Sequence, residues 1–399
     1  MLFEIVIAML LGILAGTFSG LITGIHTNLI GVSILPVLLF AGLEVEPIYL
    51  VVFVVSMAIT QTFVDFVPSI FLGAPEDGTE LSVLPGHQLL KKGSGYEAVV
   101  LACYGSLAAV IFLGIISVPF IFLSQNFLDG LYNKITTIIP GLLIFCSFYL
   151  ISEEKRKISA FLVFILTGML GLSVLNLNFF EQPLLPLLTG LFGASTLAVS
   201  IKNKSKIPPQ KILKPKKNLL KPLLGALIAS PLCGFLPGLG GGQAAIIGNS
   251  ILKTNTRGFL TLLGATNTLV MGISFIALYL ISKTRTGAAA IIKNVIGDPD
   301  KNFFFLIILV SIIVGVLSFF LTIEIAKRIS AKIEKINYTS LSVGVLIFLV
   351  ILVTIISGWF GLVVLIISTI TVIYSISMNI RRTNMMGCLI IPTIFLYLA

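Results

Sequence analysis

The segment PGLGGGQ at residues 237–243 has the residue types and spacing that would let the main chain bind an anion. Glycine adopts positive φ and allows close approach, so N–H groups at the start of a following helix can point at a negative charge. Neither GxGxxG nor GK[ST] occurs there, which argues against a nucleotide-binding loop. The candidate solute-binding residues are Pro237, Gly238, Gly240, Gly241 and Gln243. A packing kink without a ligand is the open alternative.

A comparable break lies near the N-terminus. Its glycines repeat at every fourth residue, a spacing that also lets helices pack closely: Gly12, Gly16, Gly20 and Gly24. Polar residues follow, and we expect Gly24, His26 and Asn28 to contact the solute, together with Asn267 from the second half. For His26, packing or capping and a role as proton relay or ligand contact both remain open.

A second pair of breaks carries opposite charges in the two halves. The first-half break, which includes Pro75, offers Asp65, Glu76 and Asp77 as candidate sites for a coupling ion. Its counterpart holds Lys283 and Arg285, which can neutralise a carboxylate or phosphate. Ionisable groups within apolar segments are costly, so they are functional candidates by default. Hairpin tips that simply reach water are the open alternative.

The composition places these breaks in a membrane. Of 399 residues 57% are hydrophobic, and only 26 basic and 16 acidic residues are present. This excludes an ordinary soluble enzyme, whose domains carry roughly a quarter charged residues. At about 20 residues per span, the chain has room for about 10–12 membrane segments, so we predict an all-α polytopic membrane protein. The four cysteines are widely spaced and form no CxxC pair, so no metal site and no cofactor are expected.

Basic residues orient the chain and do not suggest a nucleic-acid-binding face. Residues 1–90 contain no Lys or Arg, whereas basic loops recur later, at 91–92, 155–157, 202–221, 327–335 and 381–382. Such loops belong on the cytoplasmic side. The tract 202–221 has eight lysines, no acid and several prolines. We therefore predict an extended cytoplasmic linker that also touches anionic membrane lipid, in a multi-pass protein of the cell membrane.

Two inverted-topology repeats are predicted on either side of that linker. The boundaries are 1–201 for the N-terminal membrane repeat, 202–221 for the linker and 222–399 for the C-terminal repeat. Spans are expected near 98–123, 134–151, 158–176 and 183–201, and again near 302–326, 340–356, 359–378 and 385–399. The segments 124–133, 176–182 and 297–302 are expected as outside loops. We expect the glycine- and proline-rich breaks to form broken or re-entrant helices, which are typical of secondary transporters.

Three stretches resemble a known family, the large permease subunit of tripartite tricarboxylate transporters. They are SIFLGAPEDGTELSVLPGHQLLKKGSGYEAVVLACYGS at 69–106, PLLPLLTGLFGASTLAV at 183–199 and LCGFLPGLGGGQAAIIG at 232–248. The chain departs from the family pattern at Pro75-Glu76-Asp77, where the family has Pro-Gly-Thr. The resemblance implies a transport fold, and it also implies partners: a small membrane subunit and an external solute-binding protein.

These observations predict a permease, not an enzyme, that moves a small anionic solute of the carboxylate class, coupled to H⁺ or Na⁺. The site would lie at the bilayer midplane, where the four breaks meet. The alternative is a carrier or enzyme for an anionic lipid headgroup such as a polyprenyl phosphate, because glycine loops and basic residues hold a lipid phosphate equally well. A purely structural subunit would not need the polar breaks.

Overall fold

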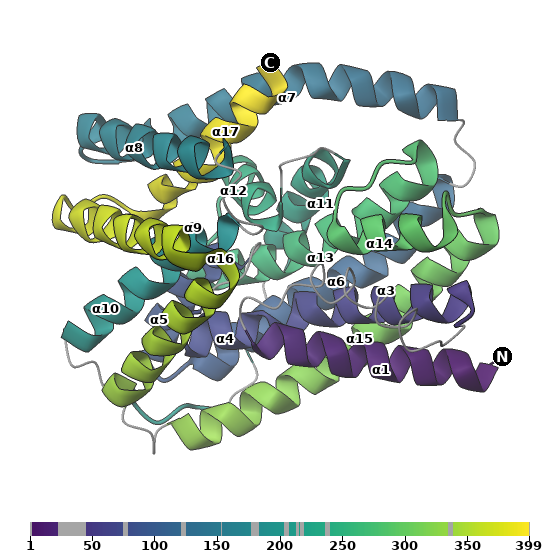
Figure 1. The fold of residues 1–399 in the computed structure, drawn as a ribbon, viewed down its shortest axis with the longest axis horizontal. Coiled ribbons are helices and arrows are strands. Elements are labelled where there is room, and N and C mark those ends of the chain that lie inside the picture. The colour runs from purple at the N-terminus through teal and green to yellow at the C-terminus, as the bar shows by residue number, and fades with distance from the viewer. Residues whose placement is uncertain are drawn as a thin grey trace. The chain divides into compact units, whose positions relative to one another are not determined.

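The computed structural model describes most of the chain, and its regular elements there are all helical (Figure 1). The described residues are 2–22, 45–74, 79–120, 125–152, 154–176, 183–202, 207–212, 215, 219–235, 240–333 and 338–398. Within them, eight helices are long and apolar enough to cross a membrane, and four shorter apolar helices accompany them. The prediction of an all-α multi-pass membrane protein is confirmed.

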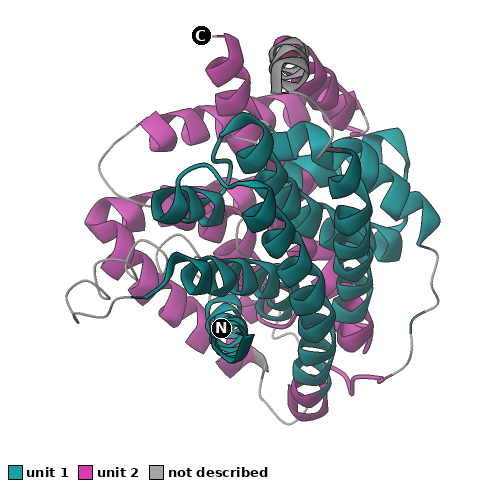
Figure 2. Cartoon of the chain, turned by 90° about the vertical axis from the view of Figure 1, so that its right-hand side faces the viewer, with its two compact units in different colours: residues 1–68, 99–133, 215–327 teal, residues 69–98, 134–214, 328–399 magenta. Residues whose placement is uncertain are grey.

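The chain forms two compact units, and each takes segments from both halves of the sequence (Figure 2). Unit 1 comprises Met1–Pro68, Val99–Asn133 and Pro215–Lys327, and unit 2 comprises Ser69–Ala98, Lys134–Lys214 and Arg328–Ala399. Compact units and sequence repeats divide a chain by different criteria. The predicted boundaries at 201 and 222 therefore stay a prediction.

Unit 1 begins with two helices that pack through glycine. In α1 (Leu2–Leu21), a β-carbon on Gly12 would lie 2.5 Å from the main-chain oxygen of Phe53 in α3 (Pro47–Val64). Gly16 and Gly20 meet α3 in the same way, one and two turns further along. The contact points advance in the same direction along α1 and along α3, so the two helices run parallel. The predicted close packing is confirmed for these three glycines; Gly24 lies outside the described residues.

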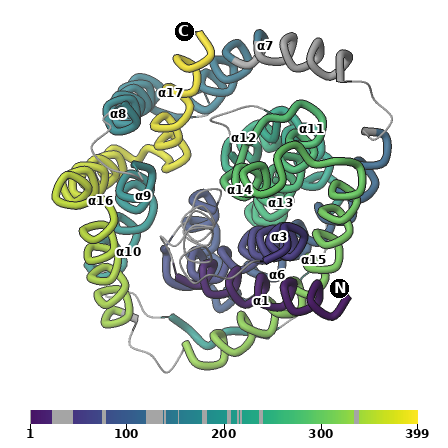
Figure 3. The backbone as a smooth tube through the Cα atoms, turned by 45° about the vertical axis from the view of Figure 1, so that its right-hand side comes forward, coloured from purple at the N-terminus to yellow at the C-terminus, as the bar shows by residue number. Residues whose placement is uncertain are grey.

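The second half opens with a similar arrangement (Figure 3). The helices are α11 (Leu220–Phe235), α12 (Gly241–Ile251) and α13 (Thr256–Ile281). Gly225 of α11 faces Leu262 of α13, and Gly234 faces Ile273, so α11 and α13 also run parallel. The shorter α12 contacts both of them and runs back between them. It is a half-length helix of the broken kind that the sequence predicts.

Unit 1 also contains the C-terminal part of α6 (Gly95–Phe120), α14 (Gly287–Ile296) and most of α15 (Lys301–Ile333), together with the helical residues 66–68 and 125–133. α6 crosses α13 where Gly105 meets the main-chain oxygen of Thr261 and Gly264 meets that of Ala102. The Ser106 hydroxyl donates to the Gly264 oxygen at 3.0 Å. Beside this crossing an apolar core forms from Leu113, Ile276, Leu280, Phe304 and Ile308.

The second pair of predicted breaks is present, and each is closed by a hydroxyl pair. The first half breaks between α4 (Phe66–Phe71) and the short helices η1 (Glu80–Ser82) and α5 (Val83–Leu90). There the hydroxyls of Ser69 and Thr79 lie 2.8 Å apart. The second half breaks between α13 and α14, where Ser274 and Thr286 make the same 2.8 Å contact. Each of the two segments thus has one hydroxyl pair at its break, which is compatible with the predicted repeat.

Unit 2 contains most of the remaining predicted spans. They are α7 (Gln125–Ser152), α8 (Lys157–Asn176), α9 (Leu184–Leu188) with the π-helix η2 (Thr189–Ala194) and α10 (Ser195–Lys202), α16 (Tyr338–Ser377), and η3 (Arg382–Met386) with α17 (Gly387–Leu398). Gly358, at φ 62°, interrupts α16, as the predicted spans 340–356 and 359–378 require.

Two loop predictions differ from the structure. Residues 125–133 belong to α7 and not to a loop, although they hold several polar side chains. Likewise α15 continues to Ile333, so most of the basic segment 327–335 is helical. In 327–335 the polar residues are Lys, Arg, Ser and Glu, and the Lys, Arg and Glu among them have high helix propensity; in 125–133 Asn, Asp and Gly have low propensity, and the helix continues nonetheless. A change in hydropathy alone therefore does not mark where a helix stops.

Candidate functional site

The structure describes seven of the predicted site residues. They are Asp65, Gly240, Gly241, Gln243, Asn267, Lys283 and Arg285. The predictions for Gly24, His26, Asn28, Pro75, Glu76, Asp77, Pro237 and Gly238 fall outside the described residues.

The start of α12 presents main-chain donors. Gly240 is the N-cap residue, in an extended conformation, and it has no side chain with which to cap the helix. Gln243 compensates in part, because its Oε1 accepts a hydrogen bond from the Gly240 N–H at 2.9 Å. The first N–H groups of a helix have no intrahelical acceptor. An end of this kind attracts negative charge through those groups and through the helix dipole.

Asn267 in α13 lies directly against this helix start. A β-carbon on Gly241 would be 2.9 Å from the Asn267 Cα, so only glycine allows α12 to approach so closely. The Asn267 amide donates to the main-chain oxygen of Thr62 in α3 at 3.4 Å. The neighbouring Thr268 hydroxyl donates to the Thr62 hydroxyl at 3.0 Å. Residues from both halves of the sequence are thus joined within unit 1.

Asp65 lies at the end of the same helix α3, about one turn beyond Thr62. It is 4% exposed, and its Oδ1 would lie 3.0 Å from a β-carbon on Gly20. A buried carboxylate in an apolar helix pair is costly. Gly241, Asn267 and Thr62 are in contact, and Asp65 follows one turn further along α3; we call these four residues of unit 1 the α3–α12–α13 cluster.

Lys283 and Arg285 lie further along the chain, in the break between α13 and α14. The α13 segment between Asn267 and this break spans about 20 Å at 1.5 Å per residue. Ser282 ends α13 in a left-handed conformation at φ 53°, and its main-chain oxygen accepts from Lys293 at 2.7 Å. Lys283 is exposed and Arg285 partly exposed. The structure thus does not place this basic pair beside Asn267.

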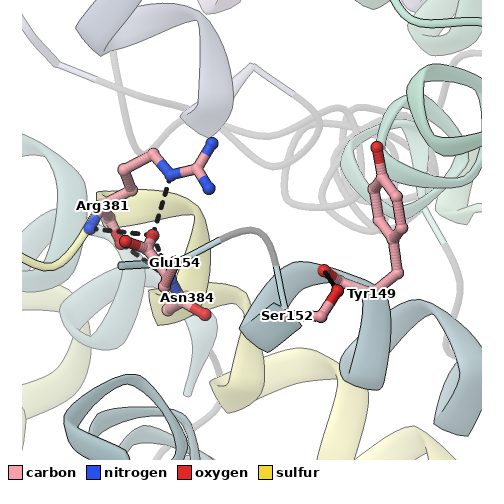
Figure 4. Close-up of polar contacts among 5 residues, drawn as sticks. All are labelled: Tyr149, Ser152, Glu154, Arg381 and Asn384. Carbon is pink, nitrogen blue, oxygen red and sulfur yellow. Dashed lines mark hydrogen bonds and ion pairs between the residues drawn. The ribbon is translucent and has the colours of Figure 1, made fainter. Parts of the chain in front are cut away.

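Sequence reasoning missed a polar cluster in unit 2. Glu154, between α7 and α8, is 7% exposed, and its Oε1 accepts from the Arg381 Nε at 2.8 Å. The same oxygen accepts from the Arg381 N–H at 3.2 Å and from the Asn384 amide at 2.9 Å. Figure 4 shows both side chains directed at the carboxylate. From the sequence, the basic segments 155–157 and 381–382 indicate only cytoplasmic loops. Glu154, the acidic residue directly before the first segment, is the one feature of the sequence that points to an ion pair there.

The linker is also attached within unit 2. The Gln210 amide donates to the main-chain oxygen of Leu90 at 3.1 Å, while its Oε1 accepts from the Gly95 N–H at 2.8 Å. Lys211 N–H donates to the Gly93 oxygen at 2.8 Å. The segment thus joins the end of α5 to the start of α6. Two loops predicted on the same side, 91–92 and 202–221, are in contact.

His87 in α5 is buried against Gly73, whose φ is +68°. Burial, with the charges of Lys91 and Arg382, lowers the His87 pKa from 6.5 to about 3. Its imidazole is therefore neutral at physiological pH. Among the residues that the structure describes, no three His, Cys, Asp or Glu side chains are grouped so that they could hold a metal ion.

Apolar spans, a half-length helix with a glycine start and buried polar groups between packed helices together define a multi-pass membrane protein with a polar interior, the class to which transporters belong. Comparison with known proteins specifies the class further. The chain belongs to the tripartite tricarboxylate transporter TctA family, which matches residues 6–387. The predicted resemblance is confirmed, and the protein is a component of a transporter and not an enzyme.

A curated relative covers nearly the whole chain. It is uncharacterized protein MJ1079 of Methanocaldococcus jannaschii, 32% identical over 401 residues, which are 98% of this chain and 98% of the relative. No solved structure matches the chain. Family membership implies an anionic solute and partner subunits.

Proposed function

We propose that the protein is a secondary active permease for a small carboxylate, coupled to H⁺ or Na⁺, with its site built on the breaks of two inverted repeats near the bilayer midplane. The observation that carries this proposal is the α3–α12–α13 cluster. It joins an uncapped, glycine-rich helix start to Asn267 and, through Thr62, to the helix that carries Asp65.

Each member has a chemical role in the proposal. The α12 N–H groups hold an anionic oxygen, because their partial positive charge is fixed in place. Asn267 and Gln243 orient the solute. Lys283 and Arg285, which lie beyond the end of α13, contribute positive potential and no direct contact at this helix start. Asp65, Glu76 and Asp77 are the candidate carriers of the coupling ion; a buried carboxylate such as Asp65 binds a proton or a cation readily. A small membrane subunit and an external binding protein complete the system.

Uptake of labelled citrate into proteoliposomes, with imposed Na⁺ or proton gradients and with the partner subunits present, tests the proposal. Asp65→Asn is expected to remove gradient dependence, and Gly241→Leu to abolish uptake. Gly344→Leu is the matched control, because Gly344 has no atom within 4 Å of the added β-carbon. Gradient-driven uptake in Asp65→Asn would remove Asp65 from coupling, and normal uptake in Gly241→Leu would contradict the site.

The proposed cell-membrane orientation has its own test. With the linker 202–221 in the cytoplasm, a cysteine placed at Lys211 in a variant that lacks the native cysteines reacts with a membrane-impermeant maleimide only after the cells are opened. Reaction in intact cells would invert the topology. The lipid-carrier alternative predicts a different result in the uptake assay: no citrate transport with any gradient.

A further inference from the structure

Adjacent arginines at the start of η3 have different surroundings. Arg381 pairs with the Glu154 carboxylate, and its side chain is 52% exposed. Arg382 donates from Nη1 to the hydroxyl of Thr196 in α10, which is a neutral group. Within the described residues, no carboxylate lies at ion-pair distance from Arg382. Glu154 therefore neutralises one arginine, while the other has no ion-pair partner in the part of the chain that the structure describes.

A second cation that interacts with Arg382 adds charge of the same sign. Lys91, at the end of α5, has its pKa lowered by burial and by the charge of Arg382. The neutral His87 imidazole lies within the reach of both charges. Arg382 is partly buried and Lys91 is exposed by its accessible surface, so the cost of desolvation falls mainly on Arg382, while the two like charges repel each other. An arrangement of this kind is stabilised when an anion occupies it.

Two contacts fix the position of Arg382. Glu154 Oε1 accepts from Arg381 and from Asn384, one residue before and two residues after it. The Thr196 hydroxyl donates to the Phe192 oxygen at 2.6 Å, which leaves its lone pairs free to accept from Arg382. Phe192 belongs to the π-helix η2, and π-helical turns occur frequently at functional sites.

The guanidinium keeps donors for a ligand. Arginine carries five N–H donors in a rigid fork that matches the two oxygens of a carboxylate or phosphate. The structure assigns one of them, from Nη1, to Thr196. Lysine adds a compact point charge that suits a second oxyanion. Arg382, Lys91 and His87 thus provide unit 2 with a bidentate donor, a second cation and a neutral imidazole.

We propose that Arg382, assisted by Lys91, binds an oxyanion of the ligand in unit 2: a carboxylate of the transported solute or, with the same chemistry, the phosphate of an anionic lipid. The solute assignment rests on the proposed function. The oxyanion site itself does not, because it follows from the charge of Arg382, which has no ion-pair partner among the described residues, and from the groups that hold it in place.

Equilibrium binding without any gradient tests this site. The full chain is placed in nanodiscs of phosphatidylcholine, and the affinity for citrate is obtained from the shift of the unfolding midpoint with concentration. Arg382→Gln is expected to weaken citrate binding by about 10-fold or more, because a charge-assisted pair contributes about 1.5–3 kcal/mol. Lys91→Gln is expected to weaken it less.

Matched variants keep the result interpretable. Lys92→Gln removes a cation that is exposed, as Lys91 is, and it is expected to leave the affinity unchanged because the proposal gives a role to Lys91 and not to Lys92. Arg382→Lys keeps the charge but loses the fork, so it serves if Arg382→Gln does not fold, and it is expected to weaken binding by several-fold. Unchanged citrate affinity in both Arg382 variants, or no binding of any probe by the natural chain, would overturn the proposal.

A second set of nanodiscs separates the two sources of the oxyanion. If phosphatidylglycerol, and not citrate, stabilises the natural chain, and Arg382→Gln removes that effect, the site stands and its ligand is a lipid headgroup. Arg382-dependent citrate binding without gradient-driven uptake would support this site while contradicting the proposed coupling. The two proposals therefore fail separately.

Discussion

Asn267 in α13 donates its side-chain amide to the main-chain oxygen of Thr62 in α3, and Thr268, the next residue, donates to the Thr62 hydroxyl. Two adjacent residues of the second half thus share one partner from the first half, Thr62, in the buried part of unit 1. Loss of the Thr62 hydroxyl and loss of the Thr268 hydroxyl are expected to affect stability differently, because Thr62 also donates to the Ile59 oxygen at 2.8 Å.

Thr62→Val is expected to destabilise the protein more than Thr268→Val. The first change leaves the Thr268 hydroxyl, 1% exposed, without its acceptor, at a cost of about 1–3 kcal/mol. After the second change, Thr62 still has its bond to Ile59. Unfolding midpoints in detergent measure this, and the double variant should cost less than the two changes added together. Strict additivity would mean that the two hydroxyls do not interact.

Gly105→Ala and Gly264→Ala are each expected to cost at least 1–3 kcal/mol, because the added methyl group meets a main-chain oxygen that cannot move away without shifting a helix. Gly141→Ala in α7 is the control. Nothing lies within 4 Å of a β-carbon there, and alanine forms helix better than glycine does. Its midpoint should therefore stay or rise, and a loss equal to that of Gly264→Ala would contradict the crossing of α6 and α13.

Removing Arg381 is expected to cost more than changing Glu154 to glutamine. Arg381→Gln leaves a carboxylate that is 5% exposed without its cation, whereas Glu154→Gln leaves a half-exposed arginine that water can solvate. Glutamine also keeps an oxygen for Asn384. Midpoints of the two variants, measured at the same pH and salt, give the order directly. The reverse order would show that the carboxylate is better solvated than its burial indicates.

His87 is expected to make the protein sensitive to acid. Its folded pKa, about 3, lies below the unfolded value of 6.5, so between these values the unfolded state binds the proton and the folded state does not. Stability is thus complete above pH 6.5 and falls as the pH decreases, by about 2 kcal/mol at pH 5. The slope of the unfolding midpoint against pH should be smaller in His87→Gln. An identical slope would assign the acid sensitivity to other groups.

Some features of this fold can be predicted from the sequence, because they depend on short local patterns of residues. The glycines of α1 were predicted to pack, and the interruption of α16 at Gly358 was predicted from the two spans on either side of it. The glycine start of α12 was predicted from PGLGGGQ, although the role of Gln243 as the acceptor for Gly240 was not. Helix interruptions are encoded by the residues at the interruption itself, which is why they were found.

Long-range partners were not accessible in this way. Nothing in the letters around Thr62 indicates Asn267, because both are polar residues in apolar helices and their meeting depends on how two helices cross. Arg381 and Arg382 look identical in a count of basic residues, yet one is paired with Glu154 and the other is not. Lys283 and Arg285 were expected near Asn267, and the length of α13 separates them along the chain.

The interleaving of the two units has a consequence for biogenesis. Unit 1 needs residues from the N-terminus to Lys327, and unit 2 needs residues from Ser69 to the C-terminus. Neither can close while the ribosome is still translating the first half, so α1, α3 and α6 wait in the bilayer for partners that are synthesised later. A chain truncated at the linker would expose the glycine and hydroxyl faces that α13 and α15 normally cover, and membrane quality-control proteases would be expected to degrade it.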